Sequence, residues 1–151
     1  WVIEDLRRMD GYHAQMASGR VGELGFSADL VLPDRPSEYF ARNVWIGASF
    51  PSPSEADAMK KVGIDRMMWG SDYPHNESTF PYNRDHLRRS FSGWDEADLR
   101  KVFAENAAEV YRIDLDALVP LAERIGPSVD EVATPLDEVP KDAFSPAFTR
   151  P

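Results

Sequence analysis

The chain has 151 residues, enough for one ordinary domain with a hydrophobic core. Its 26 acidic residues against 17 basic ones give a formal net charge of -9, which repels phosphate backbones and anionic lipids, so we expect no nucleic-acid or membrane partner. No apolar run approaches the roughly 20 residues of a membrane span. Cysteine is absent, which fits a cytoplasmic location and leaves only oxygen and imidazole groups as metal ligands.

The first residues are predicted to form an amphipathic helix that is already under way where the sequence starts. The apolar side chains that recur at helical spacing are Val2, Leu6, Met9 and Met16. Nothing before Trp1 caps this helix, so we expect the sequence to begin inside a larger protein. Three glycines and a proline predict an irregular connection from Gly19 to Pro36.

Two predicted strands flank a helix in the middle of the chain. After a helical turn at Pro36–Phe40, a β-branched and aromatic run predicts a strand over Val44–Phe50. Ser54 can cap a helix that Gly63 ends, and the apolar run Ile64–Gly70 predicts the second strand. The order strand, helix, strand implies a parallel pair with a right-handed crossover, which is typical of an α/β fold.

The second half of the chain is predicted to be mainly helical. A loop is expected over Ser71–Asn83. The spacing of apolar residues after it predicts helices over Arg84–Phe91, Asp95–Tyr111 and Leu115–Ile125, and Asp114 is the expected cap of the last one. From Ser128 onward we expect irregular structure. We assign residues 1–112 to the main domain and residues 113–151 to a helix and an acidic, proline-rich tail that lies along its surface or frays.

The second predicted strand leads into a carboxylate, Asp72, which a proline and a histidine soon follow. Ligands of parallel α/β proteins bind at the carboxyl ends of the strands, so Asp72 is the leading candidate for a metal ligand or proton acceptor. The alternative is that Asp72 closes a turn through its side chain. Period-two alternation places Gly70 and Met68 on the side of Asp72 and turns Trp69 and Met67 toward the helices.

His75 is a second candidate for the site, as a substrate-binding group or a partner of the ligand, because imidazole titrates near neutrality and often binds metals. Glu77 completes an Asp-x-x-His-x-Glu pattern, but we expect it to be solvated. The other two histidines, His13 and His86, are expected to be structural. A basic helix face, expected to be solvated or salt-bridged, comprises Arg84, Arg88 and Arg89.

A catalytic zinc centre normally takes three protein ligands. The chain has no His-x-His pair, no His-Glu-x-x-His motif, no phosphate loop and no nucleophile elbow. We therefore expect the missing ligands to come from another part of the protein.

These residues resemble the amidohydrolase-related proteins, or amidohydrolase family 2, of the metal-dependent hydrolase superfamily. The segment Ile64–His75 resembles the family's last barrel strand and its loop, and Glu105–Tyr111 resembles its closing helix. Trp1–Asp10 is similar to the helix after the sixth strand, and Pro36–Phe50 to the seventh strand and its approach. The resemblance covers about residues 1–135.

The resemblance implies a (β/α)8 TIM barrel, typically of ~250 residues or more, of which this chain is a fragment with about the last two strands. It implies that Asp72 is a ligand of a divalent metal ion, zinc in the first place, and a proton acceptor or donor in catalysis. The other ligands, a His-x-His and further histidines, would lie upstream of Trp1. The fragment alone should then be inactive.

The resemblance is compatible with two reactions on a small-molecule substrate. One is hydrolysis by a metal-activated water, and the other is a lyase reaction, the non-oxidative decarboxylation of an aromatic or unsaturated acid. A homodimer is also plausible from the resemblance. A third alternative, of another class, is a non-catalytic α/β interaction module whose acidic helical tail binds a partner.

Overall fold

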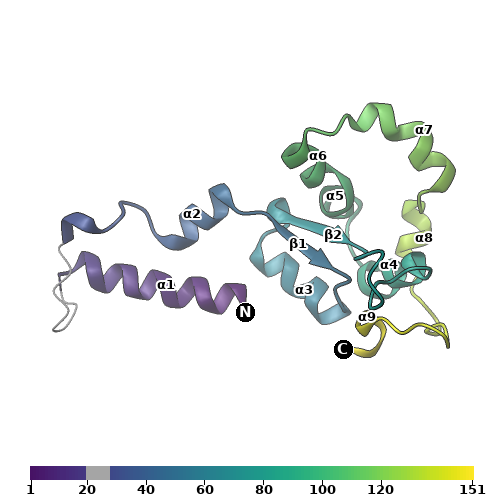
Figure 1. Ribbon diagram of the computed structural model, residues 1–151, viewed down its shortest axis with the longest axis horizontal. Coiled ribbons are helices and arrows are strands. Elements are labelled where there is room, and N and C mark those ends of the chain that lie inside the picture. The colour runs from purple at the N-terminus through teal and green to yellow at the C-terminus, as the bar shows by residue number, and fades with distance from the viewer. Residues whose placement is uncertain (20–27) are drawn as a thin grey trace. The chain divides into compact units, whose positions relative to one another are not determined.

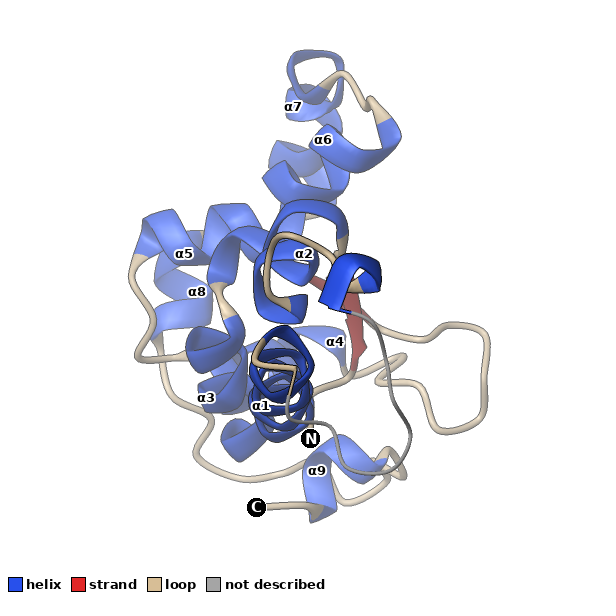
Figure 2. Cartoon of the chain, turned by 90° about the vertical axis from the view of Figure 1, so that its left-hand side faces the viewer, coloured by secondary structure: helices blue, strands red, loops and turns tan. Residues whose placement is uncertain are grey.

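The structure is a computed structural model that describes residues 1–19 and 28–151. It consists of two compact units, Trp1–Val44 and Trp45–Pro151. Helices make up most of the regular structure in the described residues (Figure 2), and the sheet has two parallel strands. The predicted α/β class is therefore confirmed. The predicted division of the chain after residue 112 stays a prediction.

The first unit contains α1 (Val2–Ala17), a 3-10 turn η1 (Ala28–Leu30) and α2 (Pro36–Asn43). The Asp10 carboxylate of α1 accepts bonds from the Ser37 amide at 2.9 Å and the Ser37 hydroxyl at 2.6 Å, which tie α1 to the first turn of α2. These two bonds hold the pKa of Asp10 below its ordinary value. Both predicted helices are present, and α2 is longer than the predicted turn.

An apolar groove of about 770 Å³ lies between α1 and α2 within the first unit. Its walls include large side chains that are well exposed to solvent, among them Trp1, Met9, Tyr12, Leu30 and Leu32. The predicted irregular connection contains η1 in its described part, and its residues 20–27 lie outside the described residues.

The second unit is built on β1 (Ile46–Ser49) and β2 (Met67–Gly70), which pair in parallel as predicted (Figure 1). Ile46 lies opposite Met67, and Ser49 lies opposite Gly70. The crossover helix is α3 (Pro53–Val62), followed by a 3-10 turn η2 (Ile64–Arg66). The predicted second strand is therefore shorter than expected, because its first three residues form this turn.

The N-cap of α3 is Ser52, and the predicted cap, Ser54, was wrong. Pro53 occupies the first helical position, where its fixed φ is favourable and its missing N–H is not needed. Glu55 then reaches back to accept a bond from the Ser52 amide at 2.8 Å, which is one half of a capping box.

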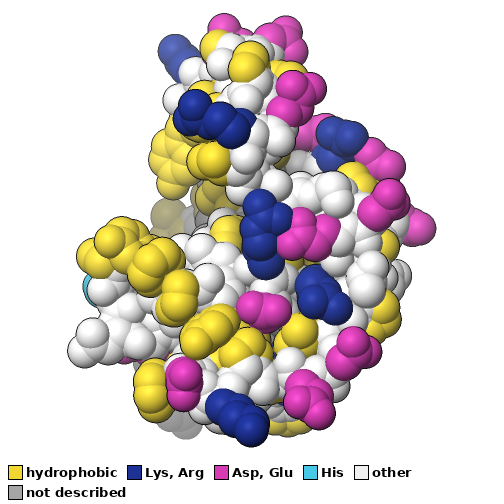
Figure 3. Space-filling model, turned by 90° about the vertical axis from the view of Figure 1, so that its right-hand side faces the viewer, with side chains coloured by type: hydrophobic (Ala, Val, Ile, Leu, Met, Phe, Trp, Pro, Cys, Tyr) yellow, Lys and Arg dark blue, Asp and Glu magenta, His cyan; other side chains and the backbone are white. Residues whose placement is uncertain are grey.

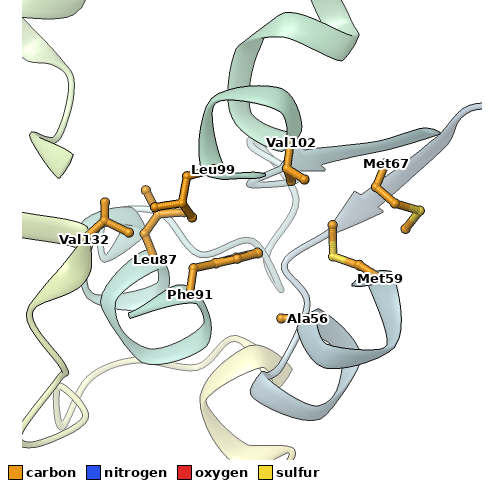
Figure 4. Close-up of a cluster of buried hydrophobic side chains, with 8 residues drawn as sticks. All are labelled: Ala56, Met59, Met67, Leu87, Phe91, Leu99, Val102 and Val132. Atoms are coloured by element: carbon orange, nitrogen blue, oxygen red, sulfur yellow. The ribbon is translucent and has the colours of Figure 1, made fainter. Parts of the chain in front are cut away.

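The hydrophobic core of the second unit lies on one face of the two-stranded sheet. Met67 is buried in it, and Ile46, Ala48 and Trp69 pack against it. The Trp69 ring lies 5.9 Å from the Phe103 ring. Figure 4 shows the buried side chains that converge from five helical segments and β2: Ala56, Met59, Met67, Leu87, Phe91, Leu99, Val102 and Val132. The prediction that Met67 and Trp69 face the helices is confirmed.

Three consecutive helical segments follow α4 (Asn83–Phe91): α5 (Glu96–Arg100), a π-helical turn η3 (Lys101–Glu105) and α6 (Asn106–Tyr111). The buried Asn106 amide donates to the carbonyls of Ile64 and Met67, both at 2.7 Å. One side chain thus satisfies two carbonyls where η2 passes into β2. The predicted helices over 84–91 and 95–111 are present.

The C-terminal part contains α7 (Leu115–Ile125), capped by Asp114 as predicted, and then α8 (Val129–Ala133) and α9 (Pro146–Thr149). The expectation of irregular structure from Ser128 onward was therefore wrong at α8 and α9. Val132, Ala147 and Phe148 are buried, so these short helices contribute to the core, and burial compensates for their shortness.

The basic face of α4 holds this C-terminal segment in place. Arg88 donates to the carbonyls of Thr134 and Pro135 at 3.0 and 2.8 Å. The bonds of Arg89 go to the carbonyls of Ala147 and Arg150 at 3.3 and 3.1 Å, and Arg84 bonds the carbonyls of Ile125 and Gly126 and pairs with Glu131. The expectation that these arginines are solvated or salt-bridged holds for Arg84, which pairs with Glu131, and was wrong for Arg88 and Arg89, whose partners are backbone carbonyls.

Charged side chains of both signs are interspersed on the face of the molecule in Figure 3, and no large basic patch forms there. Among the described helices, none combines the length and the apolar character needed to cross a membrane.

Candidate metal site at the end of strand β2

The loop that follows β2 makes a tight turn at Asp72. Its φ of 64° is in the left-handed region, which aspartate tolerates better than most residues. The His75 amide donates to the Asp72 carbonyl at 2.9 Å, and the Thr79 amide donates to the Ser71 carbonyl at 3.1 Å. Main-chain bonds therefore close the turn and the loop, so the Asp72 carboxylate is not required for that purpose.

The Asp72 carboxylate instead contacts two side chains. Oδ2 lies 3.0 Å from Nδ1 of His75, and Oδ1 lies 3.4 Å from the Ser49 hydroxyl, which can donate to it. The Asp72 side chain is 26% exposed and the His75 side chain is 68% exposed. The carboxylate is thus partly sheltered, while the histidine ring remains open to a ligand.

Glu77 joins Asp72 and His75 in a cluster of groups that could hold a metal ion. The candidate ligand atoms of the three residues all lie within 4.8 Å of one another. Carboxylate and imidazole donors suit zinc and other divalent cations, and three protein ligands are typical of catalytic zinc. Glu77 is exposed as expected, and it joins the Asp-x-x-His-x-Glu cluster, although a solvated role was preferred for it from the sequence. The described ranges 1–19 and 28–151 contain no second such group.

His86 lies outside this cluster and is fully buried. Its Nε2 donates to the Pro51 carbonyl at 2.8 Å, and its Nδ1 accepts from Nε1 of Trp69 at 3.3 Å, so both ring nitrogens are used. Burial lowers the pKa of His86 to about 4, which keeps the ring neutral. His13 contacts the Leu32 carbonyl within the first unit. Both histidines have the structural surroundings that were expected.

Two parts of the site region were missed in the sequence. Ser49 contacts Asp72 because it ends β1 beside the end of β2, and parallel pairing alone could have suggested it. The C-terminal segment also reaches the loop after His75. The two segments enclose a cavity of about 160 Å³, whose walls include Asn76, Ser78, Phe80, Ala143, Phe144 and Phe148.

The strand–helix–strand unit, with potential metal ligands in the loop at a strand's carboxyl end, defines an α/β protein with a candidate metal centre. A family model described as amidohydrolase matches residues 31–113, more than half of the chain, and the chain therefore belongs to the amidohydrolase family. The matched segment includes both strands and the whole Asp72–Glu77 loop. No curated protein and no solved structure matches the chain.

Membership of this family indicates a metal-dependent, hydrolase-like protein and an enzymatic parent. It confirms the resemblance predicted from the sequence. The individual roles of Asp72 and His75 stay predictions.

Proposed function

We propose that this chain is part of a metal-dependent hydrolase that acts on a small molecule, with Asp72 as a metal ligand and proton acceptor. The observation that carries the proposal is the convergence of Asp72, His75 and Glu77 at the end of β2, inside the segment that the family model matches. His75 is proposed to support Asp72 or to contact the substrate.

We further propose that β1 and β2 are the last two strands of a (β/α)8 barrel. In the described part of the second unit, the core helices pack against one face of the sheet, and the residues of the opposite face are mostly small, namely Gly47, Ser49, Met68 and Gly70. In such barrels the sites lie at the carboxyl ends of the strands, where Asp72 is found. The remaining metal ligands would come from other strands of the same barrel.

The donor set at the end of β2 fits a divalent cation, and zinc is the proposed ion. When bound, such an ion supplies Lewis acidity, which makes a water molecule easier to deprotonate and a carbonyl more electrophilic. Asp72 would accept the proton of the attacking water on a carboxylate oxygen. Nδ1–H of His75, at 3.0 Å from Oδ2, would keep that carboxylate oriented.

Hydrolysis is preferred to decarboxylation because the matching family is described as amidohydrolase. None of the described residues favours decarboxylation specifically.

The test is hydrolysis by the full-length protein of a panel of small amides, esters and lactones. Asp72→Asn should lower the rate by at least about a hundredfold, because it weakens the ligand and removes the proton acceptor. Asp57→Asn, the same change at an exposed position on α3, is the matched control and should retain the rate. Full activity of Asp72→Asn would rule out the assigned role, and absence of both metal and hydrolysis in the full-length protein would favour the interaction module.

A further inference from the structure

Ser49, the last residue of β1, lies beside the candidate metal ligand on the neighbouring strand end. We propose that Ser49 is a positioning residue for Asp72: its hydroxyl donates to Oδ1 at 3.4 Å, a long hydrogen bond, and restrains the orientation of the carboxylate. This inference rests on the proposed function, because the hydrogen bond from Ser49 to Asp72 can support metal binding only if Asp72 is a ligand of the cation.

The strand register explains why Ser49 reaches this carboxylate. Ser49 pairs with Gly70 across the ladder, so no side chain of β2 stands beside its hydroxyl. A Cβ built on Gly70 would meet no atom within 4 Å, which means that the space above this glycine is open. The left-handed turn at Asp72 follows two residues later and places the carboxylate within reach of β1.

Ser49 and His75 hold different oxygens of the same carboxylate. His75 contacts Oδ2 and Ser49 contacts Oδ1, so rotation about the Cβ–Cγ bond disturbs both contacts. A carboxylate offers about four lone-pair sites, so each oxygen keeps one for a cation. Partners of this kind orient metal ligands, and their loss commonly weakens metal binding 10–100-fold.

The backbone that follows Ser49 is held by contacts of the next residue, Phe50. The amide of Phe50 donates to the Gly70 carbonyl at 2.8 Å, which continues the ladder one residue beyond β1. The Arg150 guanidinium bonds the Phe50 carbonyl at 3.4 Å and lies 5.6 Å from the centre of the Phe50 ring. The serine is therefore carried by a fixed segment, as a positioning residue requires.

The test compares two substitutions of nearly equal shape in the full-length protein, Ser49→Val and Ser49→Thr. Both suit a strand, and only threonine keeps the hydroxyl. Zinc affinity is measured by competition with a chelating dye. We expect Ser49→Val to weaken zinc binding about tenfold and Ser49→Thr to stay near wild type. Ser18→Ala removes a serine hydroxyl from the first unit and should leave the affinity unchanged.

Wild-type zinc affinity in Ser49→Val would overturn the proposal. Equal losses in Ser49→Val and Ser49→Thr would also overturn it, since the effect would then follow shape and not the hydroxyl. Valine and threonine are nearly equal in shape and both suit a strand, so both variants should fold, and a far-UV circular dichroism spectrum checks this. Failure of the proposed function has a different signature: Asp72→Asn would itself bind zinc as tightly as wild type.

Discussion

Nε1–H of Trp69 donates to Nδ1 of His86 at 3.3 Å, which joins the core face of β2 to the middle of α4. Because Nε2 of the same ring donates to the Pro51 carbonyl just after β1, the neutral imidazole connects both strands of the sheet to one helix. The rings of Trp69 and His86 are also stacked, with centroids 6.0 Å apart. Trp69 is the last but one residue of β2 and Pro51 follows β1 by two residues, so this connection lies near the strand ends that carry the candidate site.

The first prediction concerns pH. The pKa of His86 falls from 6.5 to about 4 on folding, because burial disfavours the charged ring. Between these two pH values the unfolded chain binds more protons at His86 than the folded chain does. The free energy of unfolding is therefore at its full value above pH 6.5 and decreases as the pH falls toward 4. Integration gives a loss of about 3 kcal/mol in the free energy of unfolding.

Urea unfolding at a series of pH values measures this loss. The free energy of unfolding of His86→Gln should depend less on pH between 4 and 6.5, because the contribution of this histidine is gone. The variant should also be less stable than wild type at every pH. The account of His86 is contradicted if both proteins lose the same free energy over this range.

The second prediction concerns the arginines of α4. Arg88→Ala removes bonds to the Thr134 and Pro135 carbonyls and should lower the free energy of unfolding by about 1 kcal/mol. It should also speed trypsin cleavage after Lys141, because the C-terminal segment is held less firmly. Arg7→Ala breaks only an exposed pair with Glu4 on α1 and serves as the control. An unchanged cleavage rate in Arg88→Ala would show that the segment does not depend on this contact.

The third prediction concerns Asn106. Replacement by alanine leaves the carbonyls of Ile64 and Met67 without their donor, and we expect a loss of about 1–3 kcal/mol in stability. Asn43→Ala is the matched control, because Asn43 bonds an exposed carbonyl in its own helix. Thermal unfolding compares the two, and equal shifts in melting temperature would argue against a special role for Asn106.

The fourth prediction concerns Glu77. If its carboxylate completes the cluster, Glu77→Gln should weaken zinc binding to the full-length protein about tenfold. Glu138→Gln, the same change in the exposed C-terminal segment, should have no effect. Equal zinc affinities in the two variants would return Glu77 to the solvated role expected from the sequence.

Local sequence patterns predicted the elements that depend on local physics. A β-branched and aromatic run indicated the first strand, an apolar run indicated the second, and Asp114 was correctly identified as a cap. The correct cap of α3 was also visible, since Ser52 and Glu55 have the spacing of a capping box, a stronger signal than the serine at position 54.

The contacts that were missed depend on tertiary structure. The bond from Ser49 to Asp72 joins residues 23 positions apart in sequence, and it requires the register of the two strands. The bonds from the α4 arginines end on backbone carbonyls, which every residue carries, so no side-chain pattern in the tail identifies them. Helix α9 is too short to be predicted from periodicity and is stabilised by burial of Phe148.

The central claim is that Asp72 is a metal ligand. The most direct test is the zinc stoichiometry of the full-length protein, which is measured by mass spectrometry of the bound metal after dialysis. The account predicts bound metal in the wild type and in Asp57→Asn, and a clear loss of metal in Asp72→Asn. Retention of the wild-type metal content by Asp72→Asn would contradict the assignment of Asp72 as a ligand.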